Sequence, residues 1–463
     1  MCTSNTERKI LEEKYADFIQ INPYLNRKLV SFQANKKVPF YNWFGFKEGF
    51  SSEMVKYFIQ QYPKTKGIVL DPFSGSGTTL FSSSGLGFDA LGIEVLPIGS
   101  FLLKTRYAAE RVERQRFENA INKLKRANFI EYPVSSKISF KHINITKKAF
   151  PEDTERKLNG FLNYVFEEKD EEIKQLLLFA CFSILEKISY TRKDGQYLRW
   201  DARARKGKTT FNKGRVQPFE EALFEKLMIM LSDIKRNRER IKDKSKTPKI
   251  DLKTGSSLEL LPSLDEKSID LIISSPPYCN RYDYTRTYAL ELAFLGVGEN
   301  EIRSLRQRML SCTVENKEKI ELLRKIYEAN GQVDLFNKAE KAFYSNRALQ
   351  EILGVLERHK NEKKLNNPGI YRMVKNYFYE HAFIIFEMAR VLKDGGIVYY
   401  VNDNVRYSGE NIPVDLILSE FAAAAGLEVK QIYKLKNGKG NSSQQMGVHG
   451  REELRKCVYC WRK

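Results

Sequence analysis

The sequence predicts an α/β fold with a mostly parallel sheet. Short apolar runs typical of buried strands recur toward both ends of the chain, and helical patterns separate several of them, as in parallel α/β sheets. Two of these runs lead directly into turns rich in glycine or proline. Two long helical and polar stretches, at about residues 105–248 and 297–368, break the alternation, and strand-like runs resume after each. We therefore expect one α/β domain with two largely helical insertions.

The expected strands all belong to this domain. In order along the chain they occupy residues 67–71, 89–95, 249–255, 269–274, 396–401, 428–435 and 457–461. A helix is expected over residues 371–392, because apolar side chains such as Phe378 and Ile385 recur on one stripe with helical spacing. The glycine pair Gly395 and Gly396 is expected to end this helix before the next strand.

Composition and charge indicate a protein of the cell interior with a polyanionic partner. The chain has 463 residues, 42% of them hydrophobic, and no apolar stretch reaches the ~18 residues that a membrane span needs. The first residues lack the apolar middle of a secretion signal. Lysine and arginine outnumber aspartate and glutamate by 78 to 58, for which nucleic acid is the leading explanation and a lysine-rich proteome the alternative. We expect a cytoplasmic, nucleoid-associated protein that binds no membrane.

The six cysteines predict no metal site. Cys457 and Cys460 have CxxC spacing, but they lie in an expected strand, where positions three apart face opposite sides of the sheet. No second cysteine pair accompanies them, and the four histidines are scattered along the chain. We expect reduced, structural cysteines and no bound metal.

A glycine-rich turn after the first strand has the composition of a nucleotide-type cofactor site. The strand ends at Asp71, and the turn 74–77 (Ser-Gly-Ser-Gly) leads into a helix that opens with Thr78. Glycines permit a tight turn and a close approach of the backbone to a ligand. Glu94 closes the next strand about 23 residues after Asp71, where an acidic side chain can bind ribose hydroxyls. The turn matches neither the GxGxxG of dinucleotide sites nor the GK[ST] of P-loops.

A proline-rich turn after the strand 269–274 suits a flat pocket for an aromatic amine. Residues 275–278 (Ser-Pro-Pro-Tyr) follow this strand at the carboxyl edge of the sheet, where α/β folds bind ligands. The prolines stiffen the backbone and remove two amide donors, which leaves carbonyl groups and the Ser275 hydroxyl as acceptors for an exocyclic NH2 group. Tyr278 offers a face on which a flipped base can stack.

Together the two turns resemble motifs of the amino-methylating DNA methyltransferases. Residues 71–79 (DPFSGSGTT) are similar to motif I of this family, close to DPFxGxGTT, and residues 46–51 (FKEGFS) resemble its motif X. Residues 275–278 (SPPY) resemble motif IV, whose Ser-initial form is associated mainly with cytosine N4 and whose Asp- or Asn-initial forms are associated mainly with adenine N6. The resemblance implies a Rossmann-like class I methyltransferase with a mostly parallel seven-stranded sheet, and S-adenosylmethionine as cofactor.

The resemblance also assigns roles to single residues. The catalytic positions are Ser275, Pro276, Pro277 and Tyr278. The cofactor-binding positions are Phe50, Ser51, Asp71, Pro72, Phe73, Gly75, Gly77, Thr78, Thr79, Glu94 and Ser256, the last in place of the aspartate that the family often has there. The amine attacks the sulfonium methyl group directly, so no covalent nucleophile is needed. Cys279 is therefore interpreted as structural, since it follows tyrosine and not the proline of the cytosine-C5 enzymes.

The first insertion contains the densest positive charge. Between residues 192 and 215 nine lysines and arginines stand against two aspartates, and aromatic residues and three glycines are interspersed. Such a basic, mobile loop suits contacts to phosphates and base edges. The expected DNA contacts are Arg192, Lys193, Arg199, Trp200, Arg203, Arg205, Lys206, Lys208, Lys213 and Arg215, with Arg281 from the rim of the proline-rich turn.

Two shorter segments receive no single predicted role. A basic run at residues 235–240 ends a helix that begins near Pro218, where it either contacts DNA or complements the helix dipole. Residues 447–452 precede the last strand and could hold a loop near the site.

The order of the motifs completes the prediction, because the first insertion lies between the cofactor half and the catalytic half, as in the family group with a central recognition region. The segments are an N-terminal extension (1–35), the cofactor half (36–104), a basic insertion for target recognition (105–248), the catalytic part (249–296), a helical insertion (297–368) and the C-terminal part of the core (369–463). We predict a site-specific enzyme that methylates the N4 amine of a flipped cytosine in double-stranded DNA, within a restriction-modification or defence system that includes a cognate endonuclease. Adenine-N6 methylation, methylation of an RNA base and a catalytically inactive DNA-binding module are the alternatives.

Overall fold

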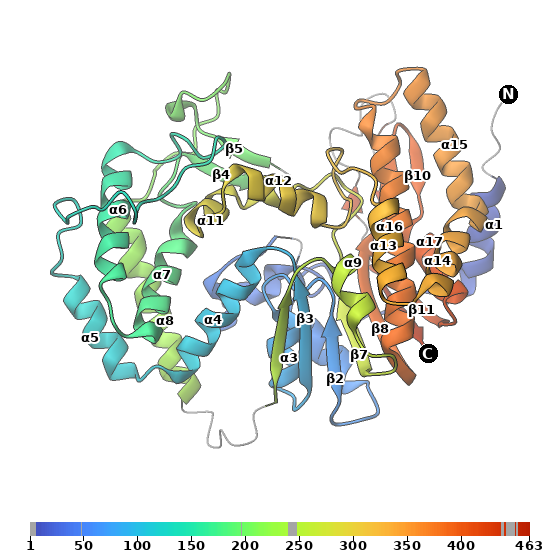
Figure 1. Cartoon of the computed structure of the whole chain (residues 1–463), viewed down its shortest axis with the longest axis horizontal. Helices are drawn as coiled ribbons and strands as arrows, with labels where there is room; N and C mark the ends of the chain where they lie inside the picture. The colour runs from blue at the N-terminus through green and yellow to red at the C-terminus, as the bar shows by residue number, and fades with distance from the viewer. Residues whose placement is uncertain are drawn as a thin grey trace.

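An eight-stranded, mostly parallel sheet forms the centre of the protein (Figure 1). The computed structural model describes residues 6–47, 49–195, 197–238, 248–436, 439–440, 450 and 452–463. The strands are β1 (Ile19–Ile21), β2 (Ile68–Asp71), β3 (Asp89–Glu94), β6 (Ile250–Thr254), β7 (Ile269–Ser274), β8 (Leu392–Asp403), β11 (Glu428–Lys434) and β14 (Lys456–Arg462), in the spatial order β1-β11-β14-β8-β7-β2-β3-β6. The predicted α/β class is confirmed.

Seven of these strands are the predicted ones, and the eighth is an addition at one edge. β1 pairs in parallel with β11, and Ile19 lies opposite Ile432. The expectation of seven strands is wrong by this one, because a strand of three residues is too short to show a pattern in the sequence. β14 runs antiparallel to both of its neighbours. Its Cys457 and Cys460 belong to hydrophobic clusters on opposite faces of the sheet, as the CxxC spacing on a strand predicts.

The strand order fixes where a ligand binds. β2 pairs with β3 on one side and with β7 on the other. The chain runs outward from β2 through β3 to β6 and returns on the opposite side at β7. At such a switch point the turns that follow the two central strands diverge and leave a crevice at the carboxyl edge of the sheet. The glycine-rich turn and the proline-rich turn both lie there.

Helices cover both faces of the sheet and form a group on each side of it (Figure 1). Near the sheet lie α2 (Ser52–Gln60), α3 (Thr78–Ser84), α4 (Pro97–Arg111), α9 (Ser257–Leu260), α16 (Gly369–Val391) and α17 (Val414–Ala424). The others are α1 (Thr6–Tyr15), α5 (Arg114–Leu124), α6 (Glu152–Phe166), α7 (Glu171–Ile184), α8 (Phe219–Arg238), α10 (Tyr284–Thr287), α11 (Ala289–Phe294), α12 (Glu299–Arg308), α13 (Ile320–Ala329), α14 (Val333–Ser345) and α15 (Arg347–Asn361). Within the described residues, none of these helices is long and apolar enough to cross a membrane.

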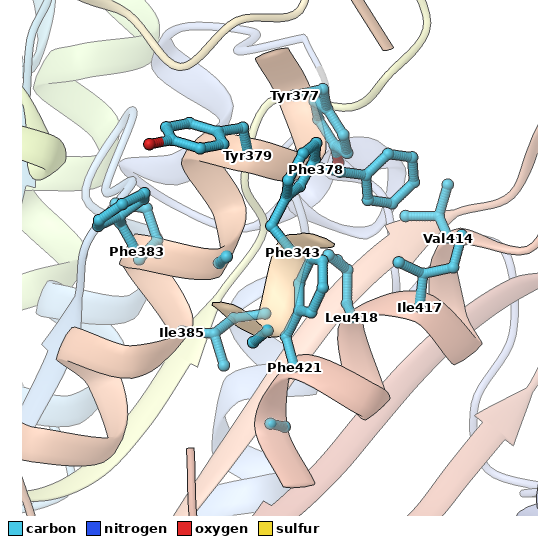
Figure 2. Packing of buried hydrophobic residues seen from close by; sticks show 14 of the residues in the cluster. Phe343, Tyr377, Phe378, Tyr379, Phe383, Ile385, Val414, Ile417, Leu418 and Phe421 are labelled. Atoms are coloured by element: carbon cyan, nitrogen blue, oxygen red, sulfur yellow. The ribbon is translucent and has the colours of Figure 1, made fainter. Parts of the chain in front are cut away.

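The largest hydrophobic cluster lies around α16. Side chains of α16 such as Phe378 and Ile385 pack with Phe343 of α14 and Phe421 of α17 (Figure 2). The predicted helix is present, but its predicted glycine exit is wrong. α16 ends at Val391 and β8 begins at the next residue, and the two glycines lie inside β8, where the pairing with β7 shifts register.

The helical insertions do not form separate bodies. α4 runs through the predicted boundary at residue 104. The second hydrophobic cluster joins α4 to α8 with α11 and α12, so that Ile302 and Leu305 of the later insertion share a core with the earlier one. α13, α14 and α15 pack instead with α16 in the first cluster. The segment boundaries given above stay predictions.

Three two-stranded pairs complete the fold. They are β4 (Thr191–Asp194) with β5 (Tyr197–Trp200), β9 (Val405–Tyr407) with β10 (Glu410–Ile412), and β12 (Lys439–Gly440) with β13 (Glu453–Leu454). The pair β4–β5 lies within the predicted basic loop, and the pair β9–β10 follows the carboxyl end of β8.

Candidate active site

The glycine-rich turn connects β2 to α3 and depends on its glycines. Gly75 has φ +51° and Gly77 has φ +78°, both in the left-handed region that favours glycine. A Cβ atom on Gly75 would lie 2.9 Å from the ring of Phe46, too close for any other residue without a shift of that ring. The turn therefore keeps its backbone exposed to the space above it.

Hydrogen bonds join the two predicted turns into one unit. The Ser274 hydroxyl donates to Asp71 Oδ1 at 2.6 Å, and the Thr79 hydroxyl donates to the Ile273 carbonyl at 3.1 Å. Asp71 also accepts from the backbone N–H of Phe73. Burial raises the pKa of Asp71 to about 6. Segments about 200 residues apart in the sequence thus hold each other at the switch point.

Glu94 lies at the end of β3 and holds the turn from the other side. Its Oε2 accepts from the backbone N–H of Gly75 at 2.7 Å, and its Oε1 accepts from the N–H of Leu96 at 2.9 Å. Burial raises the pKa of this carboxyl to about 7. Each carboxylate oxygen has two lone pairs, so both can also accept from ribose hydroxyls.

A pocket of about 770 Å³ opens between these groups. The predicted cofactor residues that line it are Phe50, Asp71, Pro72, Phe73, Gly75, Thr78, Glu94 and Ser256. From the proline-rich turn, Ser275 and Pro277 line it too. Ser51, Gly77, Thr79 and Pro276 are outside its lining.

Ser51 has a structural position instead. It is the N-cap of α2, and its hydroxyl accepts from the backbone N–H of Met54. Such a cap satisfies one of the free N–H groups at a helix start. Asn35 holds the same segment, because its side chain donates to the Phe50 carbonyl and accepts from the N–H of Ser52. Within the motif X segment, Glu48 lies outside the described residues.

The sequence did not indicate one wall of the pocket. Arg308, Met309 and Leu310 at the end of α12 line it, and the Arg308 guanidinium binds Glu259 at 2.7 Å. These residues belong to the later helical insertion, where nothing in the sequence marks them. Phe46 also lines the pocket and starts the motif X segment, so a signal for it was present.

The proline-rich turn presents an oxygen acceptor beside the pocket. The Ser275 hydroxyl donates to Tyr278 Oη at 2.9 Å, with the Val401 carbonyl 3.3 Å away. Because its proton points to these atoms, its lone pairs can accept from an amine. The Tyr407 hydroxyl donates to the Cys279 carbonyl at 2.6 Å and fixes the end of the turn. Burial raises the pKa of the Cys279 thiol far above its usual value, which agrees with a structural cysteine.

A second cavity of about 1110 Å³ adjoins the first, and Phe46 and Gly49 line both. Tyr278, Asp403 and Lys456 also line this second cavity. The exposed cations Arg27, Lys36 and Lys47 surround it. An aromatic ring and polar groups inside a basic rim suit a nucleobase with its attached phosphates.

Known proteins resemble the chain over nearly its whole length. The type II methyltransferase M.AvaI of Nostoc sp. and of Anabaena variabilis is 47% identical over 98% of this chain and 93% of its own. M.BsoBI of Geobacillus stearothermophilus is 42% identical over 99% of this chain and 92% of its own. The family model described as DNA methylase matches residues 11–97, which contain the glycine-rich turn. The chain belongs to the amino-group DNA methyltransferase family.

Members of this family use S-adenosylmethionine as the methyl donor, and the first pocket of the methyltransferase fits this cofactor. Gly75 leaves room above the turn, Glu94 offers acceptors for ribose, and Phe50 and Phe46 provide apolar walls. The type II methyltransferase M.MvaI of Kocuria varians is a more distant relative, 22% identical over 80% of this chain and 77% of its own. No solved structure matches the chain. In the described part of the chain, no group of three His, Cys, Asp or Glu could hold a metal ion.

Most of the methyltransferase's predicted DNA-contacting cations have partners within the protein. The segment 192–215 is not a mobile loop throughout, because it contains the β4–β5 hairpin. Lys193 is buried: its ammonium forms an ion pair with buried Glu291 and lies 4.6 Å from the centre of the Tyr288 ring. Lys213 donates to the carbonyl groups of Ser189 and Thr191, and burial lowers its pKa to about 8.

Other cations of this segment also have partners within the protein, but their side chains are half-buried or exposed. Arg203 binds Asp201 through two hydrogen bonds, and Lys206 donates to the carbonyls of Asn144 and Ile145 while it lies 4.4 Å from the half-buried Trp200 ring. Exposed Arg199 pairs with Asp194, and exposed Arg215 with Glu221. These contacts hold the segment in shape.

Three cations of the segment face outward. Arg192, Arg205 and Lys208 are exposed, and none of them has an ion-pair partner among the described residues. Arg281 is half-buried, follows the proline-rich turn after Cys279 and Asn280, and has φ +68°, a conformation rare outside glycine. In the basic run 235–240, Glu239 and Arg240 lie outside the described residues, and so does most of the segment 447–452.

Proposed function

We propose that this methyltransferase transfers the methyl group of S-adenosylmethionine to the N4 amine of a flipped cytosine at a specific site in double-stranded DNA. The position of Ser275 carries this proposal. Its oxygen lies between the cofactor pocket and Tyr278. The hydroxyl proton is donated to Tyr278 Oη, so the oxygen can accept a hydrogen bond from an amine. The Ser-initial turn supports cytosine N4 over adenine N6.

The residues of the site divide the work between binding and orientation. Bound S-adenosylmethionine supplies a methyl group on a cationic sulfonium, which an amine can attack directly. Glu94, Asp71 and Phe50 bind and orient the cofactor. Ser275 accepts a hydrogen bond from the amine, and the two prolines keep the turn rigid. Positioned acceptors of this kind favour an attacking amine that becomes positive in the transition state.

Three exposed cations and the half-buried Arg281 supply the DNA surface in this proposal. Arg192, Arg205 and Lys208 on the hairpin segment, and Arg281 beside the proline-rich turn, contact the duplex. Lys193 and Lys213 are excluded because their ammonium groups are engaged in internal contacts. The relatives are named type II methyltransferases, which supports a modification enzyme that protects DNA from a cognate endonuclease.

Nucleoside analysis tests the proposal. Duplex DNA is methylated in vitro with labelled S-adenosylmethionine, digested and separated, with the Ser275→Ala variant as control. N4-methylcytosine in the wild-type reaction, reduced at least tenfold in the variant, supports the proposal. N6-methyladenine alone overturns the assignment of the base, and incorporation into RNA but not into duplex DNA overturns the substrate. Sequencing of a modified host genome gives the recognition site.

A further inference from the structure

Lys456 and Asp403 form a polar corner in the second cavity, next to the proline-rich turn. Lys456 begins β14 and Asp403 ends β8, so both lie at the carboxyl edge of the sheet. The Lys456 ammonium is 2.8 Å from Asp403 Oδ1, and the two side chains are only 13% and 8% exposed. A buried ion pair is weak evidence for stability, because desolvation offsets the attraction. Its place in a cavity therefore calls for a functional explanation.

The Tyr278 hydroxyl connects this corner to Ser275. Lys456 Nζ lies 3.4 Å from Tyr278 Oη, and the Ser275 hydroxyl lies 2.9 Å from the same atom on another side. The site thus places an acceptor, Ser275, near a donor, Lys456. An aminated nucleobase presents the complementary pair on its Watson–Crick edge: an NH2 donor and, on the adjoining ring position, a nitrogen acceptor.

We propose that Lys456, held by Asp403, donates a hydrogen bond to the ring nitrogen beside the amine-bearing carbon of the target base, while Ser275 accepts from the amine. This nitrogen is N3 in cytosine and N1 in adenine. The inference rests on the proposed function, since it assigns the second cavity to the flipped base. A lysine ammonium has three donors, so Lys456 can donate to the base and keep its ion pair with Asp403.

This donor also excludes thymine, and it excludes guanine presented through its O6 and N1–H atoms. Thymine and guanine present a carbonyl oxygen with an adjoining ring N–H, which is the opposite order. Their ring N–H would point at the Lys456 ammonium and their carbonyl oxygen at the Ser275 lone pairs. Unpaired groups of this kind inside a site reject a ligand strongly.

Asp403 has a separate effect on the reaction. The attacking amine becomes positively charged as it receives the methyl group, and a nearby ammonium alone would oppose that charge. The Asp403 carboxylate neutralises Lys456, so the pair donates a hydrogen bond without adding net charge. Loss of this carboxylate is therefore expected to lower kcat more than it changes KM.

The bound base takes the place that Lys456 has in the free protein. Tyr278 is only 2% exposed, and the Lys456 ammonium lies 5.0 Å from the centre of its ring. A base that stacks on this ring displaces the ammonium from the face of the ring. Lys456 then keeps its ion pair with Asp403 while its ammonium moves from the face of the Tyr278 ring to the edge of the base.

A cycle of enzyme and substrate changes tests this contact. Wild-type enzyme and the Lys456→Met variant are compared on two duplexes, one with the target cytosine and one with 3-deazacytosine, which lacks the ring nitrogen. In both duplexes the target lies opposite an abasic position, so that lost base pairing does not contribute. The ratio of kcat/KM between the two substrates is expected to be about tenfold larger in wild type than in Lys456→Met. Equal ratios overturn the proposal.

Control variants separate this contact from a structural effect. Lys430→Met alters a lysine near the opposite end of the neighbouring strand β11 and is expected to keep the wild-type ratio. Lys456→Arg keeps a donor and is expected to retain most of the ratio, whereas Asp403→Asn is expected to reduce it. Binding of S-adenosylmethionine and the thermal midpoint show whether each variant folds. If Lys456→Met does not fold, Lys456→Leu, which also lacks a donor, takes its place.

The outcome is independent of the identity of the base. If wild-type enzyme methylates adenine, the assignment of cytosine fails, and the same cycle is run with adenine and 1-deazaadenine. Equal ratios on the base that is methylated overturn only the role of Lys456. No methylation of either duplex overturns the proposed function and with it this inference.

Discussion

Replacement of Glu94 by glutamine is expected to weaken binding of S-adenosylmethionine by about 5- to 150-fold. Both carboxylate oxygens accept from backbone N–H groups, those of Gly75 and Leu96. Glutamine keeps one acceptor and turns an NH2 group toward the other N–H. A buried donor left without an acceptor costs about 1–3 kcal/mol, and about 1.4 kcal/mol corresponds to tenfold in affinity. The glycine-rich turn is the part of the pocket that loses its support.

The same carboxyl predicts a pH dependence of cofactor binding. Burial raises its pKa from 4.5 to about 7, so it is protonated in free protein below pH 7. Ribose hydroxyls donate to the ionised form, and the sulfonium also favours a negative site. Affinity is therefore expected to rise with pH through about 7 and to fall by up to about tenfold per pH unit below it.

The effect on folding has the opposite sign. Between pH 4.5 and about 7 the folded protein binds the proton of Glu94 and the unfolded chain does not, so the contribution of this group to stability is present below pH 4.5 and is lost as pH rises through about 7. Asp71, with its pKa raised to about 6, adds a change of the same sign.

Isothermal titration with S-adenosylmethionine at pH 6, 7 and 8 measures the affinity lost in Glu94→Gln and the pH dependence of binding, and thermal unfolding over the same pH range measures the change in stability. The matched control is Glu118→Gln on α5, which removes a surface carboxylate 3.5 Å from Arg114 and is expected to change nothing. Thermal unfolding shows whether Glu94→Gln folds. If this variant binds the cofactor as tightly as wild type, with the same pH dependence, Glu94 is not part of the cofactor site.

Five further substitutions test other parts of the protein. Tyr407→Phe removes the hydrogen bond to the Cys279 carbonyl and is expected to lower kcat about 5- to 10-fold with unchanged cofactor affinity, in steady-state kinetics and calorimetry. Lys193→Met leaves the Glu291 carboxylate buried without its cation, so the free energy of unfolding is expected to fall by about 3–5 kcal/mol in urea titrations; an equal loss in the exposed control Arg199→Met would contradict this reasoning. Single alanine substitutions of Arg192, Arg205 and Lys208 are each expected to lower the slope of log Kd for duplex DNA against log salt by about one, and an unchanged slope would remove that residue from the DNA surface.

The two turns of the site could be predicted because local chemistry determines them. A strand followed by Gly75 and Gly77 forms a tight turn wherever it occurs, and a strand followed by two prolines forms a rigid one. The spacing between Asp71 and Glu94 could be interpreted because it is the length of one β-α-β unit, here β2, α3 and β3. The wall formed by Arg308 and its neighbours could not be predicted, because it reaches the pocket only through the packing of α12 on the first insertion.

The basic segment shows the limit of reasoning from local charge. Nine cations in 24 residues indicate a polyanionic partner, but a cation in a folded protein binds whichever acceptor is nearest. Lys193 binds Glu291, 98 residues later in the sequence, and Lys213 binds the backbone carbonyls of Ser189 and Thr191. Neither partner can be recognised without the fold. We therefore expect fewer residues of this segment to contact DNA, and we expect Arg27, Lys36 and Lys47 around the second cavity to add to the contacts.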